Sequence, residues 1–430
     1  MRLSLLGMAS RRLNTLLRNL LSDESGNVIA LTAVGIPLLL GCAGLAVDTI
    51  QWVSAKRELQ SAADSAAIAG VYGLIQAGEM ELAVDKSLAS NPKLDPHRAV
   101  YAERSPDPRK DDPFAVRVNI SAPAQMTFTS LFLRRPPTIN VEATATVVEN
   151  GEFCAFALGT DDEANIRFES SASVEMDCGI ATNSSSPKAV KADGSASIQA
   201  DNIVAFGGIE AEGIKSSRVR SYGVRQKDPL ADRDPPLVPN TGCPNVTVNE
   251  DAARMNGGSL TLEPGCYGNM VLKGPVFLAD GEYILNRGNF LVGETAEVTC
   301  KSCTIFLTSE QAATDPWSIG KVQIESTAKV KMAAPEQGPN AGLLFFQDRR
   351  AALAQDEIDN IISGNGFSEL KGLIYFPSQV IRIEGDRTPD IQCARFIGRR
   401  LIVQGRVMIA SGCSGSSVMN FKGTEVRLIG

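Results

Sequence analysis

The strongest constraint on this chain is an uncharged apolar run near its N-terminus, from Val28 to Val47. About 20 apolar residues in a helix match the hydrocarbon thickness of a bilayer, and a helix satisfies its own backbone hydrogen bonds there. Pro37 interrupts the run, but proline is tolerated in such helices. We therefore predict a transmembrane helix over residues 28–47. A buried core helix is the alternative.

The flanks of this run predict an orientation. Residues 1–27 form a short tail that carries Arg2, Arg11, Arg12 and Arg18. Positive charge beside a span marks its cytoplasmic side, so we expect a cytoplasmic N-terminus and an exported C-terminal region. A cleaved signal peptide is disfavoured because the apolar run is too long. Lipidation at Cys42 is disfavoured because the run continues after it.

Composition narrows the class of the exported region. A chain of 430 residues exceeds one typical domain, and a formal charge of −7 without a basic stripe argues against nucleic-acid binding. Eight of the cysteines follow the span, and an even number in an exported domain suggests disulfides. Pairing sequence neighbours gives Cys154–Cys178, Cys243–Cys266, Cys300–Cys303 and Cys393–Cys413, although other connectivities remain open.

Residues 48–150 are predicted to extend the helix and add a small α+β module. Helical character continues from Thr49 to Gly73. One helical face, which begins within the span, carries at seven-residue intervals Leu45, Trp52, Leu59 and Ala66. We expect this face to pack against other helices. A short helix over 79–91 and a polar loop over 93–112 follow. Alternating strands over 115–120 and 141–148 flank an apolar helical turn at 126–133.

Residues 151–430 are predicted to be mainly β because short strand motifs recur. The segment 171–174 returns at 195–198, 262–267 at 278–283, 268–272 at 288–292, and 342–346 at 372–376. Such periods are typical of stacked repeats, so we expect a right-handed parallel β-helix, with a β-sandwich as the alternative. The Pro-rich segment 228–240 is predicted to be an excursion, and residues 355–362 a short helix.

Three N-terminal motifs resemble the same segment of TadE/TadG-like proteins, which belong to the Tad system that assembles Flp pili. They are Ser25-Gly-Asn-Val-Ile-Ala30, Gly44-Leu-Ala-Val-Asp48 and Leu59-Gln-Ser-Ala-Ala-Asp-Ser-Ala-Ala67. The resemblance implies a pilin-like helix, half of it in the inner membrane. Leu31 stands where processed pilins carry glutamate, so the TadG type, which keeps its N-terminus, is more similar. Motifs at 154–158, 183–186, 228–230, 342–349 and 372–377 also resemble TadG-like proteins.

No catalytic, cofactor-binding or metal-binding residue is predicted. The lone His97 stands in a polar loop, and Cys300 and Cys303 lack a second ligand pair for zinc. Aspartates and glutamates such as Asp161 and Glu163 suit turns, so they are weak evidence for catalysis.

The predicted role is therefore a non-enzymatic, accessory component of Flp pilus assembly in the bacterial inner membrane. The resemblance implies other Tad proteins and pilin-like subunits as partners, and a periplasmic C-terminal domain. Self-association is compatible with the sequence. A surface adhesin is the first alternative, and a carbohydrate-active β-helix enzyme is a weaker one.

Overall fold

The structure is a computed structural model. The chain folds into two compact units. One unit is Met1–Val147 with Arg427–Gly430, and the other is Val148–Val426. The residues described are 27–76, 78–90, 99–104, 112–210, 212–239, 242–251, 258–353, 359–364, 369–385, 390–410 and 421–429. His97, Cys413 and most of the predicted tail at 1–27 lie outside them.

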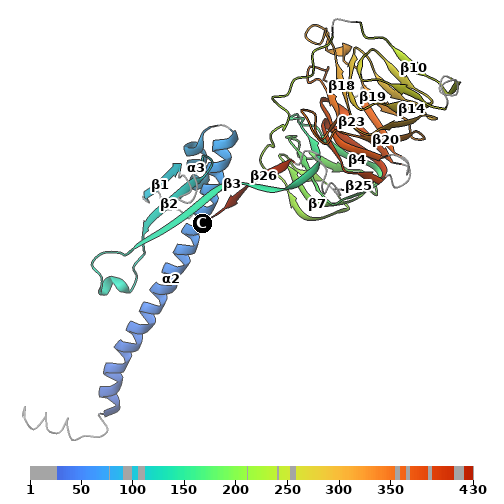
Figure 1. The fold of residues 1–430 in the computed structure, drawn as a ribbon. Coiled ribbons are helices and arrows are strands. Elements are labelled where there is room, and N and C mark those ends of the chain that lie inside the picture. Colours follow the sequence, from blue (N-terminus) through green and yellow to red (C-terminus); the bar gives the residue numbers. More distant parts are fainter. Residues whose placement is uncertain are drawn as a thin grey trace, which may run out of the picture. The chain divides into compact units, whose positions relative to one another are not determined.

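The first unit is built on one helix, α2 (Asn27–Gln76), which continues through Pro37. Its 50 residues correspond to about 75 Å. By length and composition, α2 is the one helix among the described residues that could cross a membrane. Its N-terminal half is exposed, whereas Leu59, Ala63 and Ala66 are buried. The helix therefore has an unpacked apolar half and a packed half (Figure 1).

The packed half of α2 is covered by a short helix and a three-stranded sheet. The elements are α3 (Met80–Ala89), β1 (Ala99–Arg104), β2 (Val116–Pro123), the turn η2 (Thr129–Leu131) and β3 (Thr138–Ala157). β2 pairs antiparallel with both β1 and β3. Glycine permits the close packing: a Cβ on Gly70 would lie 2.8 Å from Val116 and one on Gly73 2.5 Å from Ala83. The prediction of a loop over 93–112 was wrong for residues 99–104, which form β1.

Three ladders of parallel strands make up most of the second unit. The first ladder runs β10 (Val246–Val248), β13 (Met270–Leu272), β16 (Phe290–Val292), β19 (Val322–Ile324), β22 (Asp359–Gly364), β23 (Glu369–Gly385), β25 (Ala394–Ala410), β4 (Ile166–Met176), β6 (Val190–Ala192) and β8 (Ile209–Glu210). The helix predicted over 355–362 was wrong at 359–362, where β22 forms.

The second ladder runs β12 (Gly265–Tyr267), β15 (Gly281–Asn286), β18 (Cys303–Thr308), β21 (Leu343–Gln347), β23, β25, β3, β5 (Gly179–Thr182), β7 (Ser197–Ala205) and β9 (Ile214–Arg220). The third runs β11 (Leu260–Leu262), β14 (Pro275–Leu278), β17 (Glu297–Cys300), β20 (Lys329–Ala333) and β23. β24 (Asp390–Gln392) pairs with the end of β25, and β26 (Lys422–Leu428) is the last described strand.

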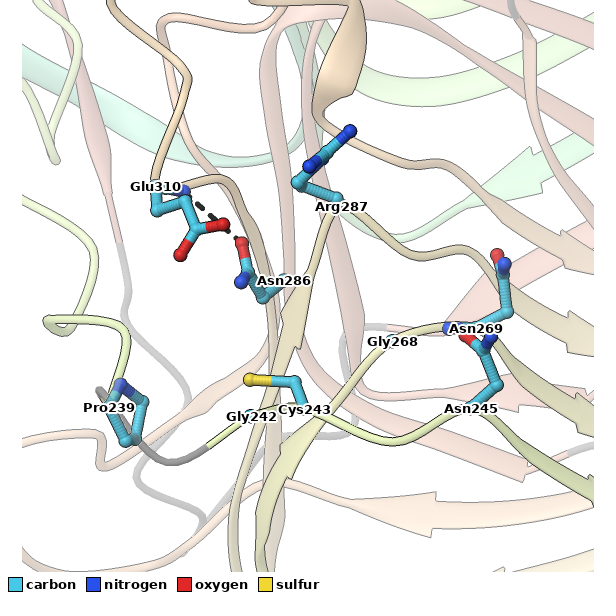
Figure 2. Close-up of a pocket in the computed structure, with 9 residues that line it drawn as sticks. All are labelled: Pro239, Gly242, Cys243, Asn245, Gly268, Asn269, Asn286, Arg287 and Glu310. Carbon is cyan, nitrogen blue, oxygen red and sulfur yellow. Dashed lines mark hydrogen bonds between the residues drawn. The ribbon is translucent and has the colours of Figure 1, made fainter.

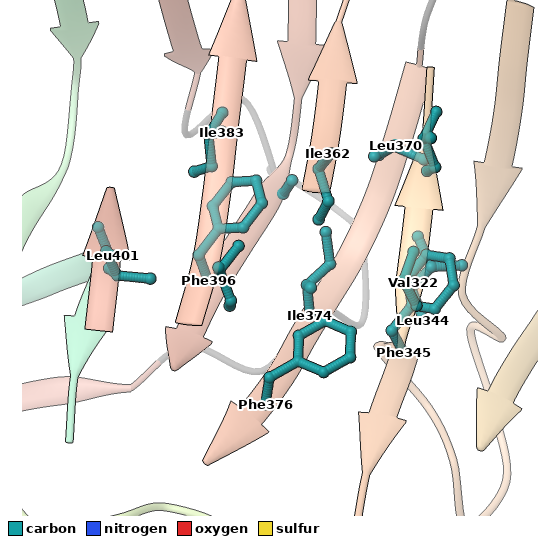
Figure 3. Close-up of a cluster of buried hydrophobic side chains, with 14 of the residues drawn as sticks. Val322, Leu344, Phe345, Ile362, Leu370, Ile374, Phe376, Ile383, Phe396 and Leu401 are labelled. Carbon is teal, nitrogen blue, oxygen red and sulfur yellow. The ribbon is translucent and has the colours of Figure 1, made fainter. Parts of the chain in front are cut away.

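Part of each predicted sequence repeat pairs in register in these ladders, but the predicted register is lost at Gly265, which pairs with Tyr283, and at Phe345, which pairs with Ile374. Leu262 pairs with Leu278, Leu272 with Val292, and Val174 with Ile198. Inward-facing apolar side chains from successive strands therefore stack into one continuous core, part of which Figure 3 shows around Phe345, Phe376 and Phe396. Stacking buries an apolar face that no single repeat could bury alone.

The stack does not follow chain order. β25, near the C-terminus, pairs with β23 on one side and with β3 and β4, the first strands of the unit, on the other. The strands of residues 243–385 and those of residues 153–220 thus meet at β25. Salt bridges from Arg399 (2.9 Å) and Arg400 (3.4 Å) to Asp161 reinforce this junction.

The Pro-rich segment returns the chain from one end of the stack to the other. We name residues 223–239 the strap. Its Gln226 N–H donates to Asn183 (2.7 Å), its Asp228 accepts from the Tyr375 hydroxyl (2.7 Å), and its Arg233 donates to Pro339 O (3.1 Å). Leu230 is buried against a second cluster that includes Phe346 and Tyr375. The strap therefore contacts the second ladder at β23 and beside β5 and β21.

Candidate functional site

The apolar half of α2 is the first candidate site. Its exposed fractions include 70% for Leu31, 65% for Leu38 and 68% for Leu39. A contiguous exposed apolar patch of this kind marks a site of interaction with a protein or a membrane. Cys42 is a free, exposed cysteine on this half.

The predicted helix-packing face is divided between the two halves. Leu59 is 2% exposed and Ala66 fully buried within the first unit, so both pack against the chain's own module. Trp52 is half-buried, and its indole N–H donates to Gln125 O at 2.7 Å. Leu45 is 46% exposed. Leu59 and Ala66 therefore pack within the chain, and packing of Leu45 and Trp52 against other helices stays a prediction.

A buried carboxylate marks the boundary between the halves. Asp48 Oδ2 accepts hydrogen bonds from Thr129 N–H (2.6 Å), Thr129 Oγ1 (2.7 Å) and Phe128 N–H (2.9 Å). Burial raises the pKa of Asp48, but these hydrogen bonds outweigh it and hold the pKa below its ordinary value. Asp48 thus fixes the turn η2 against the helix.

Gly44, one turn earlier, makes room for the same turn. A Cβ there would lie 2.7 Å from the Phe128 ring. The two ends of the Gly44-Leu-Ala-Val-Asp48 motif therefore dock one loop, residues 124–137. The predicted helical turn over 126–133 is present as η2. Its apolar side chains are exposed rather than packed: 79% for Leu131 and 68% for Phe132.

The second candidate site is an open hollow of about 570 Å³ in the β unit, shown in Figure 2. Its lining includes Asn245, Asn269, Asn286, Arg287 and Glu310. Asn286 Oδ1 accepts from Glu310 N–H at 3.1 Å. Glu310 is the single carboxylate among the described lining residues, whereas glycoside hydrolysis needs two. This geometry gives no support to the enzyme alternative.

Asparagines form a repeated corner beside this hollow. Asn245 Oδ1 accepts from Asn269 N–H (2.7 Å), Asn269 Oδ1 from Asn289 N–H (2.9 Å), and Asn289 Oδ1 from Lys321 N–H (2.8 Å). These side chains satisfy backbone groups where the coils turn. They are structural partners of the backbone, which explains the recurring Gly-Asn pair at 268–269 and 288–289.

The carboxylates named from the sequence are engaged in ion pairs. Asp161 bonds Arg399, and Glu163 bonds Arg400 at 2.6 Å. No cluster of metal-ligating residues occurs among the described residues. Partners predicted from sequence spacing lie side by side, with Cα separations of 5.7 Å for Cys154–Cys178, 4.9 Å for Cys243–Cys266 and 6.1 Å for Cys300–Cys303. The predicted partner of Cys393, Cys413, lies outside the described residues.

The comparison with protein families decides how α2 is interpreted. Residues 26–77 match the family described as putative Flp pilus-assembly TadE/G-like. The TadE/TadG resemblance predicted from the N-terminal motifs is therefore confirmed for this stretch, which we call the Tad segment. It coincides with α2 and includes both Gly44 and Asp48. The family description is one of pilus assembly rather than catalysis.

The Tad segment ends before the β unit begins, so the resemblance of the later motifs to TadG-like proteins stays a prediction. The comparisons with curated proteins and with solved structures gave no match.

Proposed function

We propose that this chain is a structural component of Flp pilus assembly, held in the inner membrane by the apolar half of α2. The observation that carries the proposal is the coincidence of the Tad segment with a helix whose N-terminal half is apolar and exposed. A role in pilus assembly follows from the family, and the exposed half supplies the membrane anchor.

The proposed orientation places the N-terminus in the cytoplasm and the β unit in the periplasm. The arginines of residues 1–27 support it through the positive-inside rule. The paired cysteines support it as well, since an oxidising compartment allows disulfides to form. We propose that the paired cysteines are oxidised, which non-reducing mass spectrometry of the periplasmic protein would test.

The proposed partners are other Tad proteins and pilin-like subunits, which would pack against α2 within the membrane. A photoreactive residue at Leu38, which is 65% exposed, should crosslink to them in cells. The same residue at Leu59, which is 2% exposed, is the matched control and should give no partner crosslink. Crosslinks from Leu38 to lipid alone would contradict the assembly role.

We further propose that the β unit is a right-handed parallel β-helix. Its parallel ladders and in-register repeats favour this architecture over a sandwich, whose sheets are usually antiparallel. It would act as a rigid periplasmic body. An experimental density map with antiparallel sheets or a left-handed coil would contradict it.

An adhesin remains the second candidate function, because of one exposed aromatic side chain. Trp317, 64% exposed, borders a hollow of about 310 Å³ with Arg287, Asn289 and Lys321. An exposed indole beside polar groups suits a sugar ring. Glycan-array binding that disappears in Trp317→Ala would favour the adhesin, and absence of binding by the intact chain would remove it.

A further inference from the structure

We propose that the loop of residues 124–137 is a second membrane contact, which inserts Leu131 and Phe132 into the periplasmic leaflet of the bilayer that α2 crosses. The inference rests on the proposed membrane anchor and adds to it an interfacial element that lies beside the span rather than within it.

The position of the loop along α2 is fixed by contacts that descend the helix. Val116, at the start of β2, packs at Gly70; Gln125, after β2, meets Trp52; and Phe128 reaches Gly44. The 26 residues from Gly70 to Gly44 correspond to about 39 Å. β2 therefore runs toward the apolar half of α2. The loop that connects β2 to β3 follows it in that direction.

The loop ends at the level where the predicted span ends. Gly44 lies one turn inside the uncharged run and Asp48 is the first charge after it. Phe128, which touches the position of a Gly44 Cβ, is thus at the depth of the outer hydrocarbon boundary. Trp52 lies one turn beyond Asp48, and tryptophan is enriched at membrane interfaces.

Hydrogen bonds hold the loop at this level. The carboxylate of Asp48 is fully buried beneath Phe128 and Thr129 and accepts three hydrogen bonds from them. Thr127 Oγ1 adds a bond to Gln51 at 3.3 Å. Asp48, Gly44 and Trp52 are positioning residues for a turn whose own apolar side chains remain uncovered.

The chemistry of the exposed tip fits a lipid interface. Phe128 is 44% exposed, Leu131 79%, Phe132 68% and Leu133 44%, and Arg134 and Arg135 follow directly. Apolar side chains beside arginines are the composition of interfacial anchors: the apolar groups enter the acyl boundary and the cations meet lipid phosphates. Continuity with the apolar surface of α2 selects lipid as the occupant.

Depth-dependent quenching tests the proposal on the full chain in vesicles of phosphatidylcholine and phosphatidylglycerol. An environment-sensitive dye is attached to a cysteine introduced by Phe132→Cys, Leu39→Cys or Lys56→Cys, each in a Cys42→Ala background. We expect shallow nitroxide lipids to quench the dye at 132, deep ones to quench it at 39, and neither to quench it at 56, which is exposed outside the predicted span.

The outcomes separate the two levels of inference. Quenching at 39 but not at 132 overturns the loop contact and leaves the membrane anchor intact. Quenching at neither position overturns both. Shielding of position 132 only in native membranes, and not in vesicles, identifies a protein partner and overturns the lipid proposal.

A second variant tests how the loop is positioned. Asp48→Ala removes the acceptor of the three hydrogen bonds and should reduce quenching at 132 while quenching at 39 is retained. Gly44→Leu, which would displace Phe128, should act in the same direction. Full quenching at 132 in both variants would overturn the role of Asp48 and Gly44 as positioning residues.

Discussion

Individual residues in this chain are constrained most tightly where one coil touches the next. A Cβ on Gly288 would lie 2.0 Å from the carbonyl oxygen of Gly268, and one on Gly320 would lie 2.0 Å from that of Gly288. Backbone approaches this closely only at glycine. The recurring glycine of the Gly-Asn corner is therefore required by stacking.

Gly288→Ala should lower the free energy of unfolding of the β unit by about 1–3 kcal/mol or more, because the backbone must shift to admit the methyl group. Gly242→Ala is the matched control, since nothing lies within 4 Å of a Cβ there. Urea unfolding of the two variants, followed by circular dichroism, measures the difference. Equal stability would contradict the close approach.

Asp348 predicts a dependence of stability on pH. Burial raises the pKa of this carboxyl, but hydrogen bonds from Arg350 (2.6 Å) and Thr308 (2.8 Å) outweigh it and hold the pKa below the ordinary value of 3.8. A carboxyl with a lowered folded-state pKa stabilises the fold above its unfolded pKa and loses this contribution as pH falls through the folded value.

The difference in unfolding free energy between wild type and Asp348→Asn should therefore be full at pH 7 and shrink as pH falls through 3.8 and below. Unfolding titrations of both proteins across this range measure it. A difference that stays constant from pH 7 to pH 3 would show that the charge of Asp348 contributes nothing.

Among the elements, the strap combines polar contacts with one apolar side chain, Leu230, that packs into the second cluster. Leu230 is 5% exposed within the cluster around Phe346 and Tyr375, whereas Leu237, seven residues later, is 93% exposed. Leu230→Ala should lower the free energy of unfolding by about 2–5 kcal/mol through loss of burial and a cavity. Leu237→Ala should leave it unchanged.

Hydrogen exchange of the full chain would locate the effect. We expect faster exchange in residues 223–239 of Leu230→Ala and unaltered exchange in Leu237→Ala. Identical exchange of the strap in the two variants would mean that Leu230 does not anchor it.

The sequence predicted elements better than their long-range assembly. Repeats such as 268–272 and 288–292 identified neighbouring coils, because stacked positions share the same need for apolar and turn residues. The sequence did not predict the pairing of β25 with β3 and β4, because this pairing joins residues that are more than 200 positions apart and share no motif. Nor did it predict β1, whose residues 99–104 occupy a polar stretch.

The candidate site was predictable to a similar extent. The apolar run and the Tad motifs located the helix that we propose as the anchor. The docking of residues 124–137 on Gly44 and Asp48 was not predicted. In the sequence, a buried carboxylate that accepts three hydrogen bonds cannot be distinguished from an ordinary polar residue at the end of a span.

At the scale of the whole molecule, β25 determines whether the β unit is one cooperative body. Stacked repeats gain stability mainly from nearest neighbours, so removal of one coil from the middle divides the stack. Phe396 is fully buried in the shared core, between Ile374 of β23 and Ala155 of β3. A charge at this position would be buried without a partner, which is costly enough to detach the coil.

Phe396→Asp should therefore make residues 153–220 and 243–385 exchange their amide hydrogens at different rates, whereas in wild type both should open together. Gln404→Asp, an exposed position on the same strand, is the control and should retain the common rate. Common behaviour of both segments in Phe396→Asp would contradict the central role of β25. Separate rates would show that a coil near the C-terminus of the chain holds the first and the later coils of the β unit in one stack.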